Sequence, residues 1–227
     1  MSDFLSIATI ILAGIVQASL QLSLGGLVLL YHSSMGHHKR RKTRYLAKNY
    51  IIGACSISFV MVCAGAFLIQ QFADAVMMQE LLVISIGALI ACALVMWLGY
   101  FREGKGTELW VPKSFARYIA RRAKQTNDNI EAFSLGMLSS FAELPLTLAI
   151  YFVVANCIVN AQVPLLAALF YIAIIALPMV ILKVSIKAGR NVVMAQKWRI
   201  RNKAFAKAFS GSSFLVLALF IVAFWVI

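Results

Sequence analysis

All 21 lysine and arginine residues of this 227-residue chain lie in three stretches, 32–48, 102–131 and 183–207. The long apolar segments contain none, and neither do the connections on their other side. This is the positive-inside pattern of a protein that crosses a membrane several times, because cytoplasmic loops retain Lys and Arg while translocated loops lack them. The pattern predicts both a membrane location and an orientation within it.

Six apolar segments are long enough to cross a bilayer, whose core of about 30 Å needs roughly 20 residues per helix. They cover approximately residues 4–31, 50–69, 81–101, 132–155, 163–182 and 208–227. With every basic loop in the cytoplasm, both termini are expected outside. The helices are then joined on the outer side by two short connections, at 70–80 and 156–162. We therefore expect an all-α polytopic membrane protein with six transmembrane helices.

The composition agrees with this interpretation, since 62% of the residues are hydrophobic and only 13% are charged. In a soluble protein the net charge of +13 would suggest nucleic acid. Here the topology accounts for the charge, so no nucleic acid is expected and anionic lipid is the expected contact of the basic loops. The first apolar run is too long for a cleavable signal peptide and lacks a basic region before it, so we expect it to remain as a membrane helix.

Segments of the first half of the chain align with segments of the second half, and the alignments occur in the same order along both halves. Two stretches of the first half align with the second half, namely 14–31 with 136–153 and 50–58 with 171–179, and Gly87 aligns with Gly211. The first alignment has no gap and places Gln17 on Ser139 and Gln21 on Glu143. The first helix runs inward and the fourth outward, so the predicted repeat is inverted.

An inverted repeat divides the chain into three parts. Residues 1–101 form the first three-helix repeat, 102–131 a cytoplasmic linker, and 132–227 the second three-helix repeat. In transporters built this way the substrate site lies near the middle of the bilayer, where the repeats meet. A site between helices one and four is therefore expected.

Glu143 is the only one of eight acidic residues that lies well inside an apolar segment. An ionised carboxylate costs a few kcal/mol there, so it should be protonated, paired or hydrated. No Lys or Arg lies at the same depth. Pro145 interrupts the helix two residues later, which a membrane tolerates only where the freed backbone groups meet protein or a cavity. The pair predicts a broken helix at a site, and the structural alternative is a kink whose Glu143 bonds a neighbouring Ser or Gln.

Other polar residues of helices one and four are candidates for the same site. Gln17 and Gln21 lie four residues apart on one helix face, and Ser139 and Ser140 precede the acidic residue by one turn. Such side chains either bind a solute or hold helices together. Pro178 in the fifth helix marks either a helix break that serves as a hinge or a packing kink.

Three histidines, His32, His37 and His38, flank the inner end of helix one and are weak candidates for metal ligands. No carboxylate or thiol is close to them in sequence, and KRRK follows directly and repels cations. Solvated loop residues are the preferred interpretation, and no metal or other cofactor is expected. Because no catalytic triad, nucleotide loop or HExxH motif is present, no catalytic residue is predicted.

The linker contains a short predicted helix at about 113–125, with Phe115, Tyr118 and Ile119 together at helical spacing and Arg and Lys around them. This pattern is typical of an amphipathic helix at the membrane interface. A docking or regulatory role for it stays open, and so does a homo-oligomer or a protein partner.

The chain resembles the lysine-exporter superfamily. The resemblance rests on Gly-x-x-polar-x-x-x-polar-Leu-x-Leu in helix one, YIIG in helix two, SLGMLSSFAELPL in helix four and YIAIIALPM in helix five. The nearest pattern is that of the CcdA/DsbD membrane-domain branch, whose six-helix members have both termini outside. The resemblance implies a bacterial inner membrane, and either export of a small solute or metal ion or transfer of thiol reducing power.

The chain departs from that branch at its reactive cysteines. Members that relay thiols use one Cys in helix one and one in helix four, whereas QASLQLS and FAELPLT contain none. The four cysteines, Cys55, Cys63, Cys92 and Cys157, lie elsewhere and are typical of packing residues. The resemblance therefore favours a carrier of a small, cationic or amino-acid-like solute with proton coupling at the buried acid. A thiol relay by Cys63 and Cys157, and a scaffold for a partner complex, are the alternatives.

Overall fold

The computed structural model describes residues 3–20, 27, 30, 40–72, 74–101, 118–119, 121–123, 125–126, 128–187 and 203–226. All regular structure within these residues is helical. The elements are α1 (Asp3–Leu20), α3 (Arg40–Phe72), α4 (Ala75–Phe101), α6 (Asn129–Ala142), α7 (Leu144–Val159), α8 (Pro164–Lys187), α10 (Lys203–Ile221) and a π-helical turn, η2 (Val222–Val226). Helices suit a bilayer because their backbone hydrogen bonds are satisfied within the segment.

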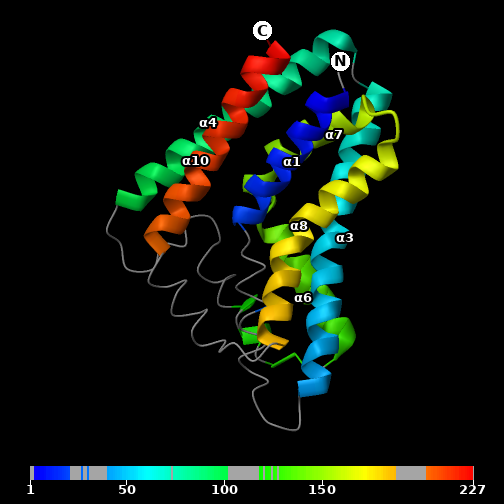
Figure 1. Cartoon of the computed structure of the whole chain (residues 1–227), viewed down its shortest axis with the longest axis vertical. Helices are drawn as coiled ribbons and strands as arrows, with labels where there is room; N and C mark the ends of the chain where they lie inside the picture. The colour runs from blue at the N-terminus through cyan, green and yellow to red at the C-terminus, as the bar shows by residue number, and fades with distance from the viewer. Residues whose placement is uncertain are drawn as a thin grey trace.

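The helices lie against one another and alternate in direction (Figure 1). Both termini lie near the end of the molecule where α3 passes into α4. From this end α1, α4 and α8 run away, whereas α3, α6 followed by α7, and α10 run toward it. Helix α10 packs along α4, and α8 packs between α1 and α3.

Several helices are suited to a membrane. Three are long and apolar enough to cross it alone, namely Tyr45–Phe72, Val76–Leu98 and Pro164–Ser185. The bent pair of α6 and α7 forms a fourth candidate, and the apolar helices Phe4–Ser19 and Ala208–Phe224 are shorter. The described residues thus contain three or four candidate spans rather than the expected six. One reason is that most of the inner part of segment 4–31 lies outside the described residues.

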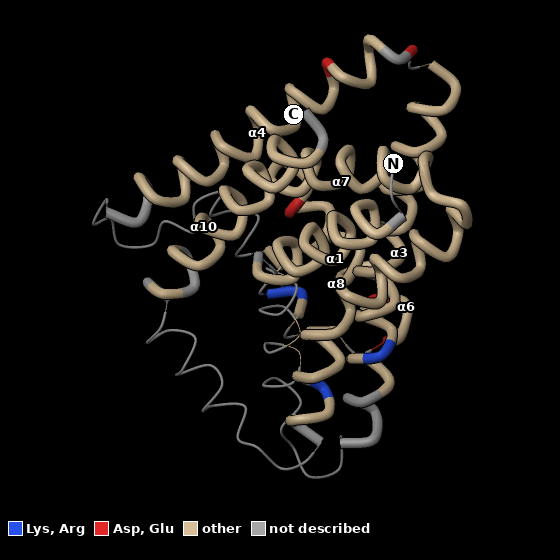
Figure 2. Tube along the Cα trace, turned by 45° about the horizontal axis from the view of Figure 1, so that its top comes forward, with Lys and Arg blue, Asp and Glu red and all other residues tan. Residues whose placement is uncertain are grey.

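The exposed side chains also fit a membrane-embedded protein. Helix α4 is apolar around its circumference and exposes Val83, Ile84, Leu94 and Leu98. Such a surface is unfavourable in water and favourable in lipid. Figure 2 shows the coloured basic residues in the lower half of the view, and none at the opposite end beside the connection from α3 to α4, where acidic residues lie.

Buried apolar side chains form two clusters. The large cluster joins α1, α4, α7, α8, α10 and the later part of α3, and includes Ile10, Val62 and Leu146. The small cluster joins the first part of α3 to α6 and α8, and includes Leu46, Ala54 and Leu135. Along α3 and along α6 with α7, the chain passes from the small cluster to the large one. The interior is therefore divided along the length of these helices.

The structure has one of the two helix breaks expected at prolines. Segment 132–155 is broken next to Glu143 and Pro145, as the sequence predicts, since α6 and α7 meet at a bend of 82°. Pro178 lies inside α8, which continues through it, so the helix break predicted at Pro178 is not observed. A single proline removes one hydrogen bond of the ladder, and a long helix packed on its neighbours can continue past that loss.

The linker helix predicted over 113–125 is described only in part. Residues 118–119, 121–123 and 125 are helical, and the rest of the amphipathic face lies outside the described residues. Tyr118 is exposed, and Arg122 lies 6.0 Å over its ring and 4.0 Å from Glu131. Ile119 packs against the small cluster instead, so the two side chains do not share one surface.

Glycines bring helices into backbone contact. A Cβ atom placed on Gly136 of α6 would lie 2.1 Å from the carbonyl oxygen of Tyr50, and one on Gly53 of α3 would lie 2.1 Å from that of Phe133. Neither position has room for a larger residue. Small residues at such crossings let membrane helices approach closely enough to gain van der Waals contact.

We predict that Gly136→Ala destabilises the protein by about 1–3 kcal/mol, because the added methyl group must push α6 away from the α3 backbone. Gly87→Ala is the matched control, since nothing lies within 4 Å of a Cβ atom there and alanine is the better helix former. Thermal unfolding followed by size-exclusion chromatography in detergent would compare the two. Equal midpoints for both variants would contradict the close packing of α3 and α6.

Candidate functional site

The helix break between α6 and α7 lies at Glu143. Its N–H donates to the carbonyl of Ser140 at 3.1 Å, and its own carbonyl accepts from the N–H groups of Leu146 and Thr147 at 3.0 and 3.1 Å. Its backbone angles, φ −83° and ψ −13°, are unstrained. Pro145 falls in the first turn of α7, where a missing N–H costs no helix hydrogen bond. The chain can therefore turn sharply here with its backbone satisfied.

Buried polar residues gather around this break and form a layer between the two apolar clusters. Glu143 is 4% exposed and Gln17 is 2% exposed, values typical of core residues. We define the polar layer as Gln17, Ser58, Ser139, Ser140, Glu143 and Thr147, all of which are buried. Along α3, for example, Ser58 falls between Ala54 of the small cluster and Val62 of the large one. Ala54, Ser58 and Val62 follow one another at intervals of about one helical turn, so the polar layer is thin along α3.

Gln17 links three helices through its amide group and a fourth through Tyr151. Its Nε2 donates to the Tyr151 hydroxyl of α7 at 2.8 Å, and its Oε1 accepts from the Tyr171 hydroxyl of α8. The Tyr151 hydroxyl also lies 3.0 Å from the Oγ of Ser58 in α3. Ser58 also lies 3.4 Å from the carbonyl of Ala54, to which it can donate. These hydrogen bonds connect α8 through α1 and α7 to α3.

The same series of hydrogen bonds extends to the helix break. Thr147 bonds the backbone carbonyl of Glu143 through its hydroxyl at 3.1 Å, and its side chain also interacts with the Tyr151 hydroxyl. The Glu143 carboxyl group itself acts electrostatically on Tyr151. Glu143, Thr147 and Tyr151 succeed one another at intervals of four residues and so share one face. Glu143 therefore lies on the same helix face as Tyr151, the partner of Gln17.

A second buried bond joins the hydroxyls of Tyr50 in α3 and Ser139 in α6 at 2.7 Å. Ser139 also lies 2.9 Å from the carbonyl of Gly136, to which it donates. Tyr50 and Tyr171 are the first residues of the aligned segments 50–58 and 171–179. Their partners, Ser139 and Gln17, are likewise aligned with each other. The two tyrosines and their partners therefore occupy aligned positions in the sequence.

The structure brings most of the candidate residues into one layer. Gln17, Ser139, Ser140 and Glu143 are all buried within it, on α1, on α6 and at the break that ends α6. Gln21 lies outside the described residues, as do His32, His37 and His38. Pro145 is exposed and shapes the break rather than the interior of the layer.

Five residues of the network were not among the candidates, namely Tyr50, Ser58, Thr147, Tyr151 and Tyr171. A signal for most of them exists in the sequence. Thr147 and Tyr151 follow Glu143 on the same helix face, and Tyr50 aligns with Tyr171. Tyrosines in apolar segments are common at membrane interfaces, which hides such a pair. Ser58 has no comparable signal.

The described residues contain neither a paired thiol nor a cluster of metal-binding side chains. Cys55, Cys63, Cys92 and Cys157 are all free thiols. No group of three or more His, Cys, Asp or Glu side chains within the described ranges could hold a metal ion. The polar layer is therefore built from hydroxyls, amides and one carboxyl group.

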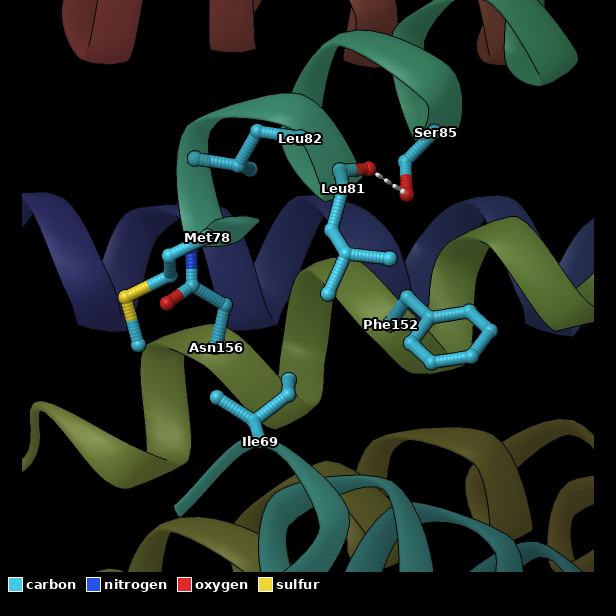
Figure 3. Close-up of a pocket in the computed structure, with 7 residues that line it drawn as sticks. All are labelled: Ile69, Met78, Leu81, Leu82, Ser85, Phe152 and Asn156. Carbon is cyan, nitrogen blue, oxygen red and sulfur yellow. Dashed lines mark hydrogen bonds between the residues drawn. The ribbon is translucent and has the colours of Figure 1, made fainter. Parts of the chain in front are cut away.

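A small pocket lies away from this layer, between α4 and the end of α7 (Figure 3). It has room for about one water molecule. Its lining consists of Ile69, Met78, Leu81, Leu82, Ser85, Phe152 and Asn156. Asn156 follows Glu143 by 13 residues of mostly helical chain, which places it about 20 Å further along. The pocket is too small for a solute and does not belong to the candidate site.

No protein-family model, curated protein or solved structure matches the chain. The function of the chain must therefore be inferred from the geometry of the polar layer.

We predict that Tyr151→Phe lowers the free energy of unfolding by about 1–3 kcal/mol, because Gln17 and Ser58 lose a shared partner in a buried position. Tyr45→Phe provides the control, since Tyr45 lies on the same helix as Ser58 but is 53% exposed. The thermal midpoints of both variants and of the wild type would be measured in detergent. A loss of the same size in both variants would contradict a cooperative network around Gln17.

Proposed function

We propose that the chain is a six-helix membrane carrier that exports a small solute by alternating access, coupled to protons at Glu143. The observation that carries this proposal is a carboxyl group buried at an 82° helix break, inside a polar layer with an apolar cluster on each side. A scaffold has no need of such an arrangement. A carrier requires it, because solute and coupling ion must bind in the interior and remain sealed from both sides.

The carboxyl group can act in two protonation states. When protonated, Glu143 is neutral and can pass through the closed state at low cost, which couples movement to the proton gradient. When ionised, it attracts a cationic or amino-bearing solute. Gln17 and Gln21 would form the wall opposite it, with Ser139 and Ser140 supplying hydroxyls beside it. Release of the proton on one side and uptake on the other would then drive export.

The proposed orientation places the small cluster toward the cytoplasm and the large cluster toward the outside. The basic stretches support it, and so does the placement of the coloured Lys and Arg residues in the lower half of Figure 2, away from the connection of α3 to α4. Both termini share the end where α3 meets α4, which agrees with two outer termini and an even number of crossings (Figure 1).

The contacts between helices support an inverted repeat. If α1 corresponds to α6 with α7, α3 to α8, and α4 to α10, each contact should have a counterpart. Helix α1 contacts α8 as α6 contacts α3, and α1 contacts α10 as α7 contacts α4. Gly14 packs on Ile174 of α8, while the aligned Gly136 packs on the corresponding face of α3. The two tyrosine bonds follow the same correspondence.

We predict that Glu143→Gln abolishes export while leaving the protein folded, since the amide keeps the shape of the side chain but cannot bind and release a proton. Extracellular and intracellular small-molecule profiles would be compared for cells with wild-type protein, with Glu143→Gln, and with Glu80→Gln, which alters an exposed carboxylate. A solute exported by the wild type and by Glu80→Gln alone would identify the substrate class.

Other outcomes separate the alternatives. Identical profiles in all three strains would contradict the carrier. A thiol relay would survive Glu143→Gln and fail when Cys63 or Cys157 is replaced by Ser. A scaffold would survive all of these changes and lose its partner only when an exposed face or a basic loop is altered.

We also predict the topology of the loops. In a variant without native cysteines, Asp74→Cys should react with a membrane-impermeant maleimide in intact cells, because it lies in a connection proposed to be outside. Arg121→Cys should react only after the membrane is opened. Both residues are exposed, so the side of the membrane decides the outcome. The reverse pattern would contradict the proposed orientation.

A further inference from the structure

Tyr50 and Tyr171 lie on opposite sides of the polar layer. Tyr50 belongs to the small cluster and Tyr171 to the large cluster, and both side chains are fully buried. Each forms a hydrogen bond with a residue of the polar layer. The Tyr50 hydroxyl bonds the Ser139 hydroxyl, and the Tyr171 hydroxyl donates to Gln17. Each bond therefore joins an apolar cluster to the layer between the clusters.

The depths of the two residues agree with this placement. Tyr50 lies near the start of the span Tyr45–Phe72, and Tyr171 near the start of the span Pro164–Ser185. Because α3 and α8 run in opposite directions, these two starts lie toward opposite ends of the molecule (Figure 1). Ser58 lies midway along the first span, between the levels of the two tyrosines.

We propose that the two bonds are the gates of the carrier, with Tyr50–Ser139 as the cytoplasmic gate and Tyr171–Gln17 as the outer gate. This inference rests on the proposed function and on its orientation. Each gate consists of one tyrosine bond and the apolar cluster around it, and each joins a pair of helices that corresponds to the other pair in the repeat. Opening one bond separates α3 from α6 on the inner side, and opening the other separates α8 from α1 on the outer side.

Both bonds are formed in the structure, and the residues of the polar layer are buried. An inverted repeat gives the two ends the same design, so a conformation that opens one gate has a counterpart that opens the other. Gln17 gives the outer gate a direct connection to Tyr151, which follows Glu143 by eight residues on the same helix face. Solute or proton binding in the polar layer can thereby favour one closed gate over the other.

The test measures access to the middle of the molecule from each side. Ser58→Cys is introduced as the reporter into a full-length variant in which Cys55, Cys63, Cys92 and Cys157 are replaced by Ala. A charged, membrane-impermeant methanethiosulfonate is applied to right-side-out and to inside-out vesicles, and the rate of modification is measured. Tyr50→Phe should raise the rate from the cytoplasmic side, and Tyr171→Phe should raise it from the outer side.

The expected change is about fivefold for each gate, as for the loss of one buried hydrogen bond. Tyr45→Phe should change neither rate. Ser139→Ala removes the other half of the cytoplasmic gate and should reproduce Tyr50→Phe, which keeps the test informative if the tyrosine variant does not fold. Unchanged rates in all gate variants, or a rise from the same side for both gates, would overturn the proposal.

The labelling does not depend on knowing the solute, so the two proposals can fail separately. Opposite-sided changes in a protein that exports nothing would support the gates and contradict the export function. Export that depends on Glu143, together with labelling that is insensitive to both tyrosines, would support the carrier and overturn the gates.

Discussion

The cost of leaving a polar group without a partner in apolar surroundings organises the interior of this protein. The polar layer lies between two apolar clusters, where water is not available to compensate a lost bond. Gln17 meets this demand by using both ends of its amide, and it thereby ties α1 to α7 and α8. The positions of four helices follow from the need to satisfy one side chain and its neighbours.

The helix break at Glu143 follows the same rule. Turning the chain inside an apolar bundle exposes backbone groups, and here they are bonded by Ser140, Leu146 and Thr147. Pro145 falls in the first turn of a new helix, where its missing N–H is harmless, and it favours the break. Pro178 has no such break before it and remains inside a continuous helix. The effect of a proline thus depends on whether neighbouring residues can satisfy the interrupted backbone.

The correspondence between the halves gives the layer its proposed functional meaning. The two tyrosine bonds and the main pairs of packed helices correspond when the three-helix units of the proposed repeat are exchanged. A carboxyl group at the centre of such an arrangement can be reached alternately from two sides by equivalent movements. This is the physical basis for preferring a carrier over a static scaffold, whose two ends would have no reason to match.

The sequence by itself determined the all-helical membrane character and the expected orientation, and it singled out Glu143, because hydropathy, charge distribution and an acid inside an apolar segment are local properties. The alignment of the two halves also placed Gln17 at the position that corresponds to Ser139. Only the tertiary structure decided that Tyr151 and Tyr171 complete the network, since they lie 134 and 154 residues from Gln17 in the chain. It likewise decided the angle of the break and the continuity of α8. Such pairings depend on how distant helices pack, which no local pattern specifies.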